Sequence, residues 1–443
     1  MNPGVPSSPL HDAHIWPIGA GVDADGVLTV GGLRATDLAA EFGTPAYLLD
    51  EDDFRSRARR WRTAFADADV FYAGKAFLCT AVARWVAEEG LGLDVCTGGE
   101  LAVALRAGFD PARLQFHGNN KSVPEMRRAV EVRVGRVVVD SFDEIDRLAR
   151  IAADAGTVQR VMVRVTPGVE AHTHEFISTG QEDQKFGFSL STGSAAKAIL
   201  AVEGHRSLEL VGLHAHIGSQ IFDAAGFELA AHRMAELLSL TTTQLGREVR
   251  ELNLGGGVGI AYVSGDDPMD IGDFANQLRA IVNTECDRAG IAVPRLAVEP
   301  GRSIVGPSTV TLYEVGTVKE LPGLRTYVSV DGGMSDNIRT ALYDACYTAL
   351  LANRASSAPD KTVTICGKHC ESGDIVVRDV ALPDDVRPGD LIAVPASGAY
   401  QRSMANNYNH VPRPPVVAIR GGEARVIVRR ETEADLLRLD AEA

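Results

Sequence analysis

The chain has 443 residues, of which 45% are hydrophobic and 23% are charged, and its formal net charge at pH 7 is −15. These values predict a globular protein of two or three domains, and they argue against nucleic acid or an anionic membrane as the main partner. The first residues lack the basic and apolar regions of a secretory signal, and no apolar run approaches the roughly 20 residues of a membrane span. We therefore expect a cytoplasmic protein.

The six cysteines are scattered along the chain and fit no disulfide framework. One short segment, Cys366 to Cys370 with His369 inside it, contains the residue types of a zinc site. No second cysteine pair completes that site, so we expect no bound metal.

The N-terminal residues 1–45 are expected to form an irregular lead-in, with a short β segment at 26–30 and a small helix at about 36–42. From about 46 to 305, short apolar runs of strand type alternate with amphipathic stretches of helical type. This alternation predicts parallel strands. The eight runs lie at 70–73, 91–95, 114–117, 136–140, 161–166, 210–216, 251–254 and 295–298.

Eight strand and helix repeats in about 250 residues match the number and size of a TIM barrel. We therefore predict an α/β TIM barrel, (β/α)8, over residues 46–305, and the alternative is a doubly wound open sheet. The helices expected between the runs include 78–89, 99–107, 141–155, 227–245 and 274–289.

The residue pattern changes from about residue 306, where alternating runs rich in β-branched residues are separated by glycine and proline. This pattern predicts a mostly antiparallel β domain, of sandwich or barrel-like form, over 306–443. We expect residues 1–45 to join it, a short helix near 337–345, and a short charged helix or disorder at 431–443. The predicted strands lie at 309–318, 325–330, 362–366, 374–380, 390–394 and within 415–429.

Polar and titratable residues collect at the ends of the predicted barrel strands. The chemistry of TIM barrels lies at the carboxyl ends of their strands, so these residues are expected to converge. Polar residues that served only solubility would not be concentrated at the strand ends. The residues are Lys75, Asp94, His117, His214, His216, Ser219, the glycines 255–257, and the run from Glu299 to Arg302.

Together these residue types suit one cofactor, pyridoxal 5′-phosphate (PLP). A lysine at a strand end can form a Schiff base, and a glycine run after the seventh strand lets backbone N–H groups approach a phosphate. A carboxylate at Glu299 can pair with a pyridinium nitrogen, and His216 can stack on the ring. Each residue alone has an ordinary structural explanation, as a surface lysine, a tight turn or a salt bridge.

At these residues the chain resembles the alanine-racemase-like, fold-type III PLP-dependent decarboxylases over nearly its full length. It departs from their pattern at Gly74, where a bulkier residue is more usual, and at Thr340, where proline is common. The motifs that carry the resemblance are Tyr72-Ala-Gly-Lys75-Ala, Asp94-Val-Cys-Thr-Gly-Gly-Glu100, His172-Thr-His174, Gln184-Lys-Phe-Gly-Phe188, His214-Ala-His-Ile-Gly-Ser-Gln220, Asn253-Leu-Gly-Gly-Gly257, Glu299-Pro-Gly-Arg302, Asp331-Gly-Gly-Met, Asp336-Asn-Ile-Arg339-Thr-Ala-Leu-Tyr343, Cys370-Glu-Ser-Gly-Asp374 and Ser397-Gly-Ala-Tyr400.

The resemblance implies a role for each site residue. The implied catalytic residues are Lys75, which would bond to the cofactor, Cys370, which would donate a proton, and His216. Cys370 and Glu371 would reach the site from a second subunit, which implies a homodimer with shared active sites. The implied cofactor-binding residues are Lys75, Asp94, His216, Ser219, Gly256, Gly257, Glu299, Gly301, Arg302 and Tyr400. The implied substrate-binding residues are Arg302, Arg339, Tyr343, Glu371 and Tyr400.

Within this family the chain is most similar to members that decarboxylate meso-2,6-diaminopimelate to L-lysine, the last step of lysine biosynthesis. Arg302 and Arg339 suit the second carboxylate of that substrate, whereas ornithine carries only an ammonium at its far end. The alternatives are a decarboxylase for ornithine, arginine or a carboxylated polyamine, a racemase of the same fold, a catalytically inactive homologue, and a phosphate-binding barrel without PLP.

Overall fold

The computed structural model describes residues 10–169 and 185–442. Contacts between residues divide the chain into two compact units, which we call the barrel unit and the β unit. The barrel unit comprises 58–259 and 268–301, and the β unit comprises the residues up to Arg57, 260–267 and 302–443. No helix among the described residues is long and apolar enough to cross a bilayer.

The barrel unit contains a closed sheet of eight parallel strands. Each strand pairs with the next along the chain, and β13 pairs with β5 to close the ring, which confirms the predicted TIM barrel. The short strand β10 (Phe188–Ser189) adds to the edge of β9. The barrel strands are β5 (Asp69–Ala73), β6 (Gly92–Val95), β7 (Leu114–Phe116), β8 (Arg136–Val139), β9 (Gln159–Thr166), β11 (Leu208–His214), β12 (Glu251–Asn253) and β13 (Arg295–Val298).

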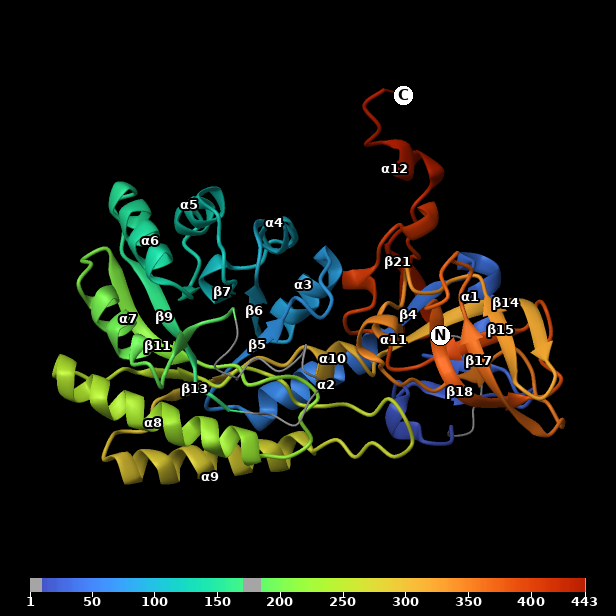
Figure 1. Cartoon of the computed structure of the whole chain (residues 1–443), viewed down its shortest axis with the longest axis horizontal. Helices are drawn as coiled ribbons and strands as arrows, with labels where there is room; N and C mark the ends of the chain where they lie inside the picture. The colour runs from blue at the N-terminus through green and yellow to red at the C-terminus, as the bar shows by residue number, and fades with distance from the viewer. Residues whose placement is uncertain (1–9, 170–184, 443) are drawn as a thin grey trace. The chain divides into compact units, whose positions relative to one another are not determined.

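Helices surround these strands in the barrel unit (Figure 1). Their apolar residues face the sheet, as in α6, where Ile145, Leu148 and Ala152 are buried. α5 begins at a capping box formed by Ser122 and Glu125. The helices are α3 (Thr80–Glu88), α4 (Gly98–Ala107), α5 (Val123–Glu131), α6 (Phe142–Asp154), α7 (Ser194–Glu203), α8 (Ala225–Leu245) and α9 (Ile271–Ala289).

The β unit is built on a sheet with the strand order β18-β17-β15-β14-β4-β20-β21, and β19 with β16 is attached to β14. All its pairings are antiparallel except β15 with β17 and β4 with β20, so the predicted mostly antiparallel domain is confirmed. Its strands are β4 (Ala46–Asp50), β14 (Thr309–Leu321), β15 (Arg325–Val330), β16 (Leu350–Leu351), β17 (Asp360–Cys366), β18 (Ile375–Pro383), β19 (Leu391–Val394), β20 (Val416–Arg420) and β21 (Glu423–Val428).

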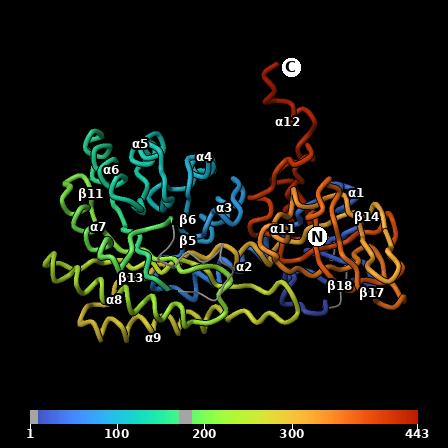
Figure 2. The backbone as a smooth tube through the Cα atoms, viewed as in Figure 1, coloured from blue at the N-terminus to red at the C-terminus, as the bar shows by residue number. Residues whose placement is uncertain are grey.

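The remaining elements of the β unit are short, except for α2 with its 14 residues. The N-terminal segment packs among C-terminal ones, as the blue and orange parts of the tube show (Figure 2). α2 begins in this unit and continues into the barrel unit. These elements are β1 (Ala20–Val22), β2 (Leu28–Val30), β3 (Leu33–Arg34), α1 (Ala35–Phe42), α2 (Glu51–Ala64), α10 (Arg302–Val305), α11 (Arg339–Tyr343) and α12 (Glu433–Leu437).

The unit boundaries differ from the predicted ones at three places, the shortest of which is 302–305, a segment that lies in the β unit. The segment 46–57 lies in the β unit, because β4 pairs with β14 on one edge and with β20 on the other. The loop residues 260–267 also belong to the β unit, where Ile260 and Tyr262 enter its apolar core. The N-terminal strand β2 shares that core through Leu28 and Val30, but it pairs with β1 and β3 in a separate sheet.

Candidate active site

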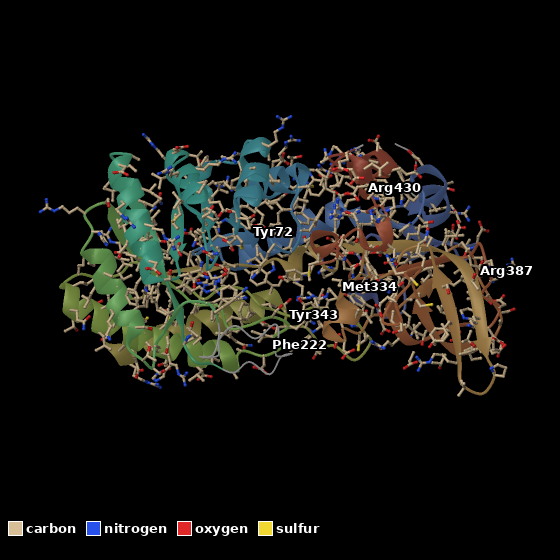
Figure 3. All side chains as sticks on the ribbon, turned by 45° about the horizontal axis from the view of Figure 1, so that its top comes forward. Tyr72, Phe222, Met334, Tyr343, Arg387 and Arg430 are labelled. Carbon is tan, nitrogen blue, oxygen red and sulfur yellow. The ribbon has the colours of Figure 1, made fainter. Side chains whose placement is uncertain are left out.

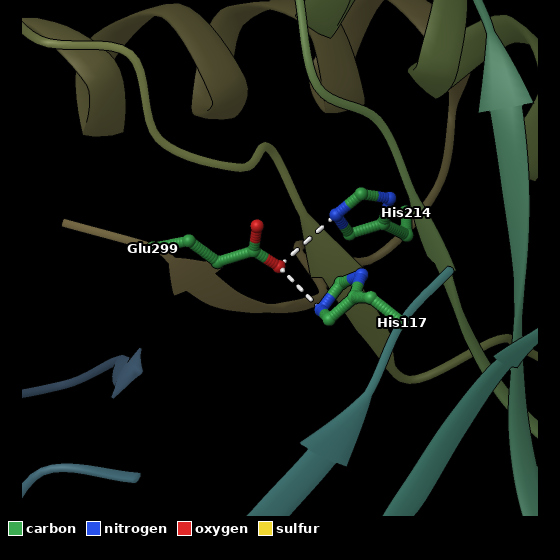
Figure 4. A group of neighbouring side chains, drawn as sticks. All are labelled: His117, His214 and Glu299. Carbon is green, nitrogen blue, oxygen red and sulfur yellow. Dashed lines mark hydrogen bonds and ion pairs between the residues drawn. The ribbon is translucent and has the colours of Figure 1, made fainter. Parts of the chain in front are cut away.

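A buried carboxylate, that of Glu299, lies at the carboxyl ends of the barrel strands, directly after β13. Its Oε1 accepts hydrogen bonds from Gln115 Nε2 at 2.8 Å and from Asn253 Nδ2 at 2.7 Å. The Nε2 atoms of His214 and His117 lie 3.0 and 3.3 Å from the same oxygen (Figure 4). The second carboxylate oxygen points away from both imidazoles in Figure 4.

These neighbours keep Glu299 ionised. Burial alone would raise the pKa of its carboxyl, but the Nε2–H of His214 and the protonated ring of His117 hold that pKa well below its usual range. Burial lowers the pKa of His214 to about 4, so this ring is neutral at pH 7 and donates its Nε2–H to Glu299. An ionised carboxylate in a dry interior is a group that stabilises a cation placed against it.

A second buried carboxylate, Asp94 at β6, lies beside this group. Its Oδ1 is 3.5 Å from His117 Nε2. Burial and repulsion from Glu299 raise the pKa of Asp94 to about 7. Burial opposes the charging of His117, but Glu299 and Asp94 together raise the pKa of His117 to about 9. The two acids therefore favour the protonated form of His117.

The glycine turn after β12 packs closely against the neighbouring loops. A Cβ atom at Gly256 would lie 2.2 Å from the backbone oxygen of Glu299, and one at Gly257 would lie 2.5 Å from that of Gly218. Gly257 also has a φ of +115°, which side chains rarely adopt. Only glycine fits at these two positions, so the turn presents backbone to the barrel mouth. Ser219 lies on the adjoining loop after β11, where it is half-buried.

His216 lies next to the glycine turn. Its Nδ1 accepts a hydrogen bond from the backbone N–H of Gly256 at 3.2 Å. Burial, followed by the positive charge of Lys75, lowers the pKa of His216 well below its usual value, so its ring is neutral. The structure thus brings together His216 and Gly256, both of which were predicted to bind the cofactor.

Lys75 lies two residues beyond β5 in a turn and is exposed. Its positive charge opposes part of the rise in the pKa of Asp94 and contributes to the lowered pKa of His216, so the amine interacts with both groups. The turn is fixed by a hydrogen bond from Gly74 N to Asp94 O at 3.1 Å. A Cβ at residue 74 would lie 2.7 Å from that oxygen, so the unusual Gly74 has a steric reason.

Both predicted arginines lie in the β unit, in a buried cluster of tyrosines. The guanidinium carbon of Arg302 lies 4.8 Å from the ring centre of Tyr400, and that of Arg339 lies 5.7 Å from the same ring. Arg339 also stacks over Tyr343 at 5.4 Å and donates from Nε to Tyr347 Oη at 3.0 Å. Within the described parts of the chain, no carboxylate forms an ion pair with Arg339.

The other two predicted residues, Cys370 and Glu371, lie in the loop between β17 and β18. Both are exposed, and the structure describes no contact of their side chains with Arg302 or Arg339. The motif residues 172–174 and 184 lie outside the described residues.

Sequence reasoning missed several residues that complete the Glu299 site and the arginine cluster. Gln115 and Asn253 hold the Glu299 carboxylate, and Tyr262 and Tyr347 line the arginine cluster. The available signal for Gln115 is a polar side chain inside an otherwise apolar strand, and that for Asn253 is a polar side chain at the carboxyl end of β12. The sequence places His117 at a strand end but does not indicate its partners Glu299 and Asp94.

The chain is similar to known proteins over most of its length. Residues 51–306 match the family model described as the pyridoxal binding domain of pyridoxal-dependent decarboxylases. The chain is 56% identical to the diaminopimelate decarboxylase of Mycobacterium tuberculosis over 441 residues, which covers 97% of this chain and 99% of the relative. It is 49% identical to the diaminopimelate decarboxylase of Bacillus subtilis over 419 residues, covering 94% and 95% respectively.

Solved structures show the same similarity. The crystal structure of the diaminopimelate decarboxylase of M. jannaschii in complex with L-lysine matches this fold with a TM-score of 0.89. The sequence identity is 33%, and the match covers 96% of this chain and 98% of that one. The likeness therefore extends over both units of the chain.

Proposed function

This chain belongs to the diaminopimelate decarboxylase family of pyridoxal-dependent decarboxylases, and from this membership we propose that it converts meso-2,6-diaminopimelate to L-lysine and carbon dioxide. The reaction is the last step of lysine biosynthesis. The observation that carries the proposal is the ionised, buried carboxylate of Glu299 at the carboxyl ends of the barrel strands.

The barrel residues fit PLP in two respects. Glu299 supplies the buried, ionised carboxylate that a protonated pyridine nitrogen requires. Gly256 and Gly257 let the turn after β12 pack against the neighbouring loops, which keeps a stretch of backbone without side chains at the carboxyl ends of the strands. The position of this turn after the seventh strand is also the usual phosphate site of TIM barrels.

When bound, PLP supplies an electron sink for the charge that develops as carbon dioxide leaves. We assign to Lys75 the amine that holds the cofactor, and to Glu299 the charge that keeps the ring nitrogen protonated. His216 presents a neutral ring to pack against the cofactor. The other residues assigned to cofactor binding are Asp94, Ser219, Gly256, Gly257, Gly301, Arg302 and Tyr400.

The arginine cluster supports the choice of substrate. Arg339 is a buried cation without an acidic partner among the described residues, so a substrate carboxylate would neutralise it. With ornithine, whose far end is an ammonium, leaving the arginine unpaired would cost on the order of 2–5 kcal/mol. We assign Arg302, Arg339, Tyr343 and Tyr400 to the second amino-acid head of diaminopimelate.

We further propose a homodimer in which Cys370 donates a proton to the substrate Cα and Glu371 binds its ammonium in the partner's site. The exposure of both residues at a loop tip in the single chain supports this arrangement. A cytoplasmic location belongs to the same proposal, because all six cysteines are free thiols, as is usual in reducing compartments.

The experiment that tests the function is product analysis with purified protein, added PLP and four substrates offered separately. These are meso-diaminopimelate, L-lysine, L-ornithine and L-arginine. We expect carbon dioxide and lysine from meso-diaminopimelate alone. Turnover of ornithine or arginine in its place would contradict the assignment of Arg302 and Arg339, while leaving the cofactor site intact.

A further inference from the structure

Asp374 is a buried carboxylate just before β18, and hydrogen bonds join it to two separate segments of the β unit. Its Oδ1 accepts from the backbone N–H of Met334 at 2.6 Å. Its Oδ2 accepts from the backbone N–H of His369 at 2.8 Å and lies 3.0 Å from His369 Nδ1. Met334 (Figure 3) lies in the turn that leads to Arg339, and His369 immediately precedes Cys370.

Two glycines let these segments close around the carboxylate. A Cβ at Gly333 would lie 2.5 Å from Asp374 Oδ1, and one at Gly367 would lie 2.4 Å from Oδ2. The segments also bond to each other directly, from Lys368 N to Gly332 O at 3.0 Å. The two glycines therefore serve close packing around one acid.

The base of the Cys370 loop is anchored while its tip is exposed. The imidazole of His369 is fully buried and stacks on the ring of Tyr408, with ring centres 5.7 Å apart and planes 6° from parallel. The backbone N–H of Cys370 donates to Asn409 Oδ1 at 2.9 Å. Cys370 and Glu371 thus protrude from a rigid base.

We propose that Asp374, together with His369, is a positioning residue that sets the Cys370 loop and the segment leading to Arg339 in register with each other. This inference rests on the proposed roles of Cys370 and Arg339. A carboxylate suits the position because it only accepts hydrogen bonds, and the backbone groups that face it on both sides are N–H donors. An asparagine of the same shape would turn its own N–H groups toward one of these backbone N–H donors, so that one hydrogen bond would be lost.

The test is hydrogen exchange of the Asp374→Asn variant, followed by mass spectrometry of the peptides that cover 331–340 and 367–374. We expect exchange at Met334 and His369 to quicken at least about tenfold in both peptides, because hydrogen bonds to charged acceptors are the stronger ones. The control is Asp379→Asn, an exposed aspartate of β18 whose positive φ an asparagine also tolerates. Unchanged exchange in either segment of Asp374→Asn would overturn the coupling.

A second variant, His369→Phe, keeps a ring against Tyr408 but removes the Nδ1 contact. We expect it to quicken exchange only in 367–374, and it keeps the inference testable if Asp374→Asn does not fold. In kinetics, Asp374→Asn should raise the KM for meso-diaminopimelate more than His369→Phe does, because only the former releases the segment leading to Arg339. Equal effects on KM would contradict that coupling.

Exchange is measured without substrate, so the two proposals can fail separately. A wild-type protein inactive on meso-diaminopimelate, with both segments loosened in Asp374→Asn, would refute the function and support the positioning role. An active wild-type protein, with exchange unaltered in Asp374→Asn, would support the function and refute the positioning role.

Discussion

Replacing Glu299 by glutamine removes the charge at the centre of the barrel site. Glutamine keeps a carbonyl oxygen that can accept from Gln115 and Asn253, as Oε1 does in the structure. Its N–H2 group would take the place of the second carboxylate oxygen, so a protonated ring nitrogen would lose its acceptor. Hydrogen bonds to charged groups contribute about 1.5–3 kcal/mol, which predicts a roughly 10- to 150-fold fall in kcat.

The assay is lysine formation from meso-diaminopimelate at saturating substrate and PLP, with cofactor loading checked by absorbance. Glu131→Gln is the matched control, because Glu131 is an exposed glutamate at the end of α5. We expect the control to retain wild-type kcat. A loaded Glu299→Gln enzyme with kcat within about twofold of wild type would refute the reasoning that the Glu299 charge drives the reaction.

Three further predictions concern binding, packing and pH. Arg339→Met removes the buried cation, so the KM for meso-diaminopimelate should rise at least about tenfold in steady-state kinetics, and an unchanged KM would remove Arg339 from substrate binding. Lys121→Met leaves Glu144 buried without its partner at 2.7 Å and should lower the free energy of unfolding in urea by about 3–5 kcal/mol; a loss under about 1 kcal/mol would contradict this. Burial raises the pKa of Asp50 from 3.8 to about 6, so stability is lost as pH rises between these values, by up to about 3 kcal/mol. Asp50→Asn should escape that loss in urea titrations at about pH 4 and pH 7, and a parallel loss in the variant would contradict the shift.

The barrel strands were predictable because both of their faces are buried, so most of them read as short, mainly apolar runs. The run 46–50 looks the same, yet β4 pairs with β14 and β20 in the β unit. Burial on both faces does not specify which sheet a strand joins. That choice depends on pairing with strands far along the chain, which an apolar run does not encode.

The candidate site was predictable to different degrees. Lys75 and Glu299 stood out because they follow strand ends, where a barrel gathers its chemistry. Gln115 lies inside β7 and Asn253 at the end of β12, where a single polar residue is a weak signal because it does not identify its partner. Cys370 and Arg339 came only from the resemblance, because the β unit lacks a repeating geometry that would place its loops.

The measurement that tests the central claim most directly is borohydride reduction of the PLP-loaded protein, followed by peptide mapping. Reduction fixes the cofactor to the amine that holds it, and the account predicts one modified peptide, containing Lys75. Modification of a different lysine, or none in a protein that decarboxylates meso-diaminopimelate, would contradict the assignment of the barrel site.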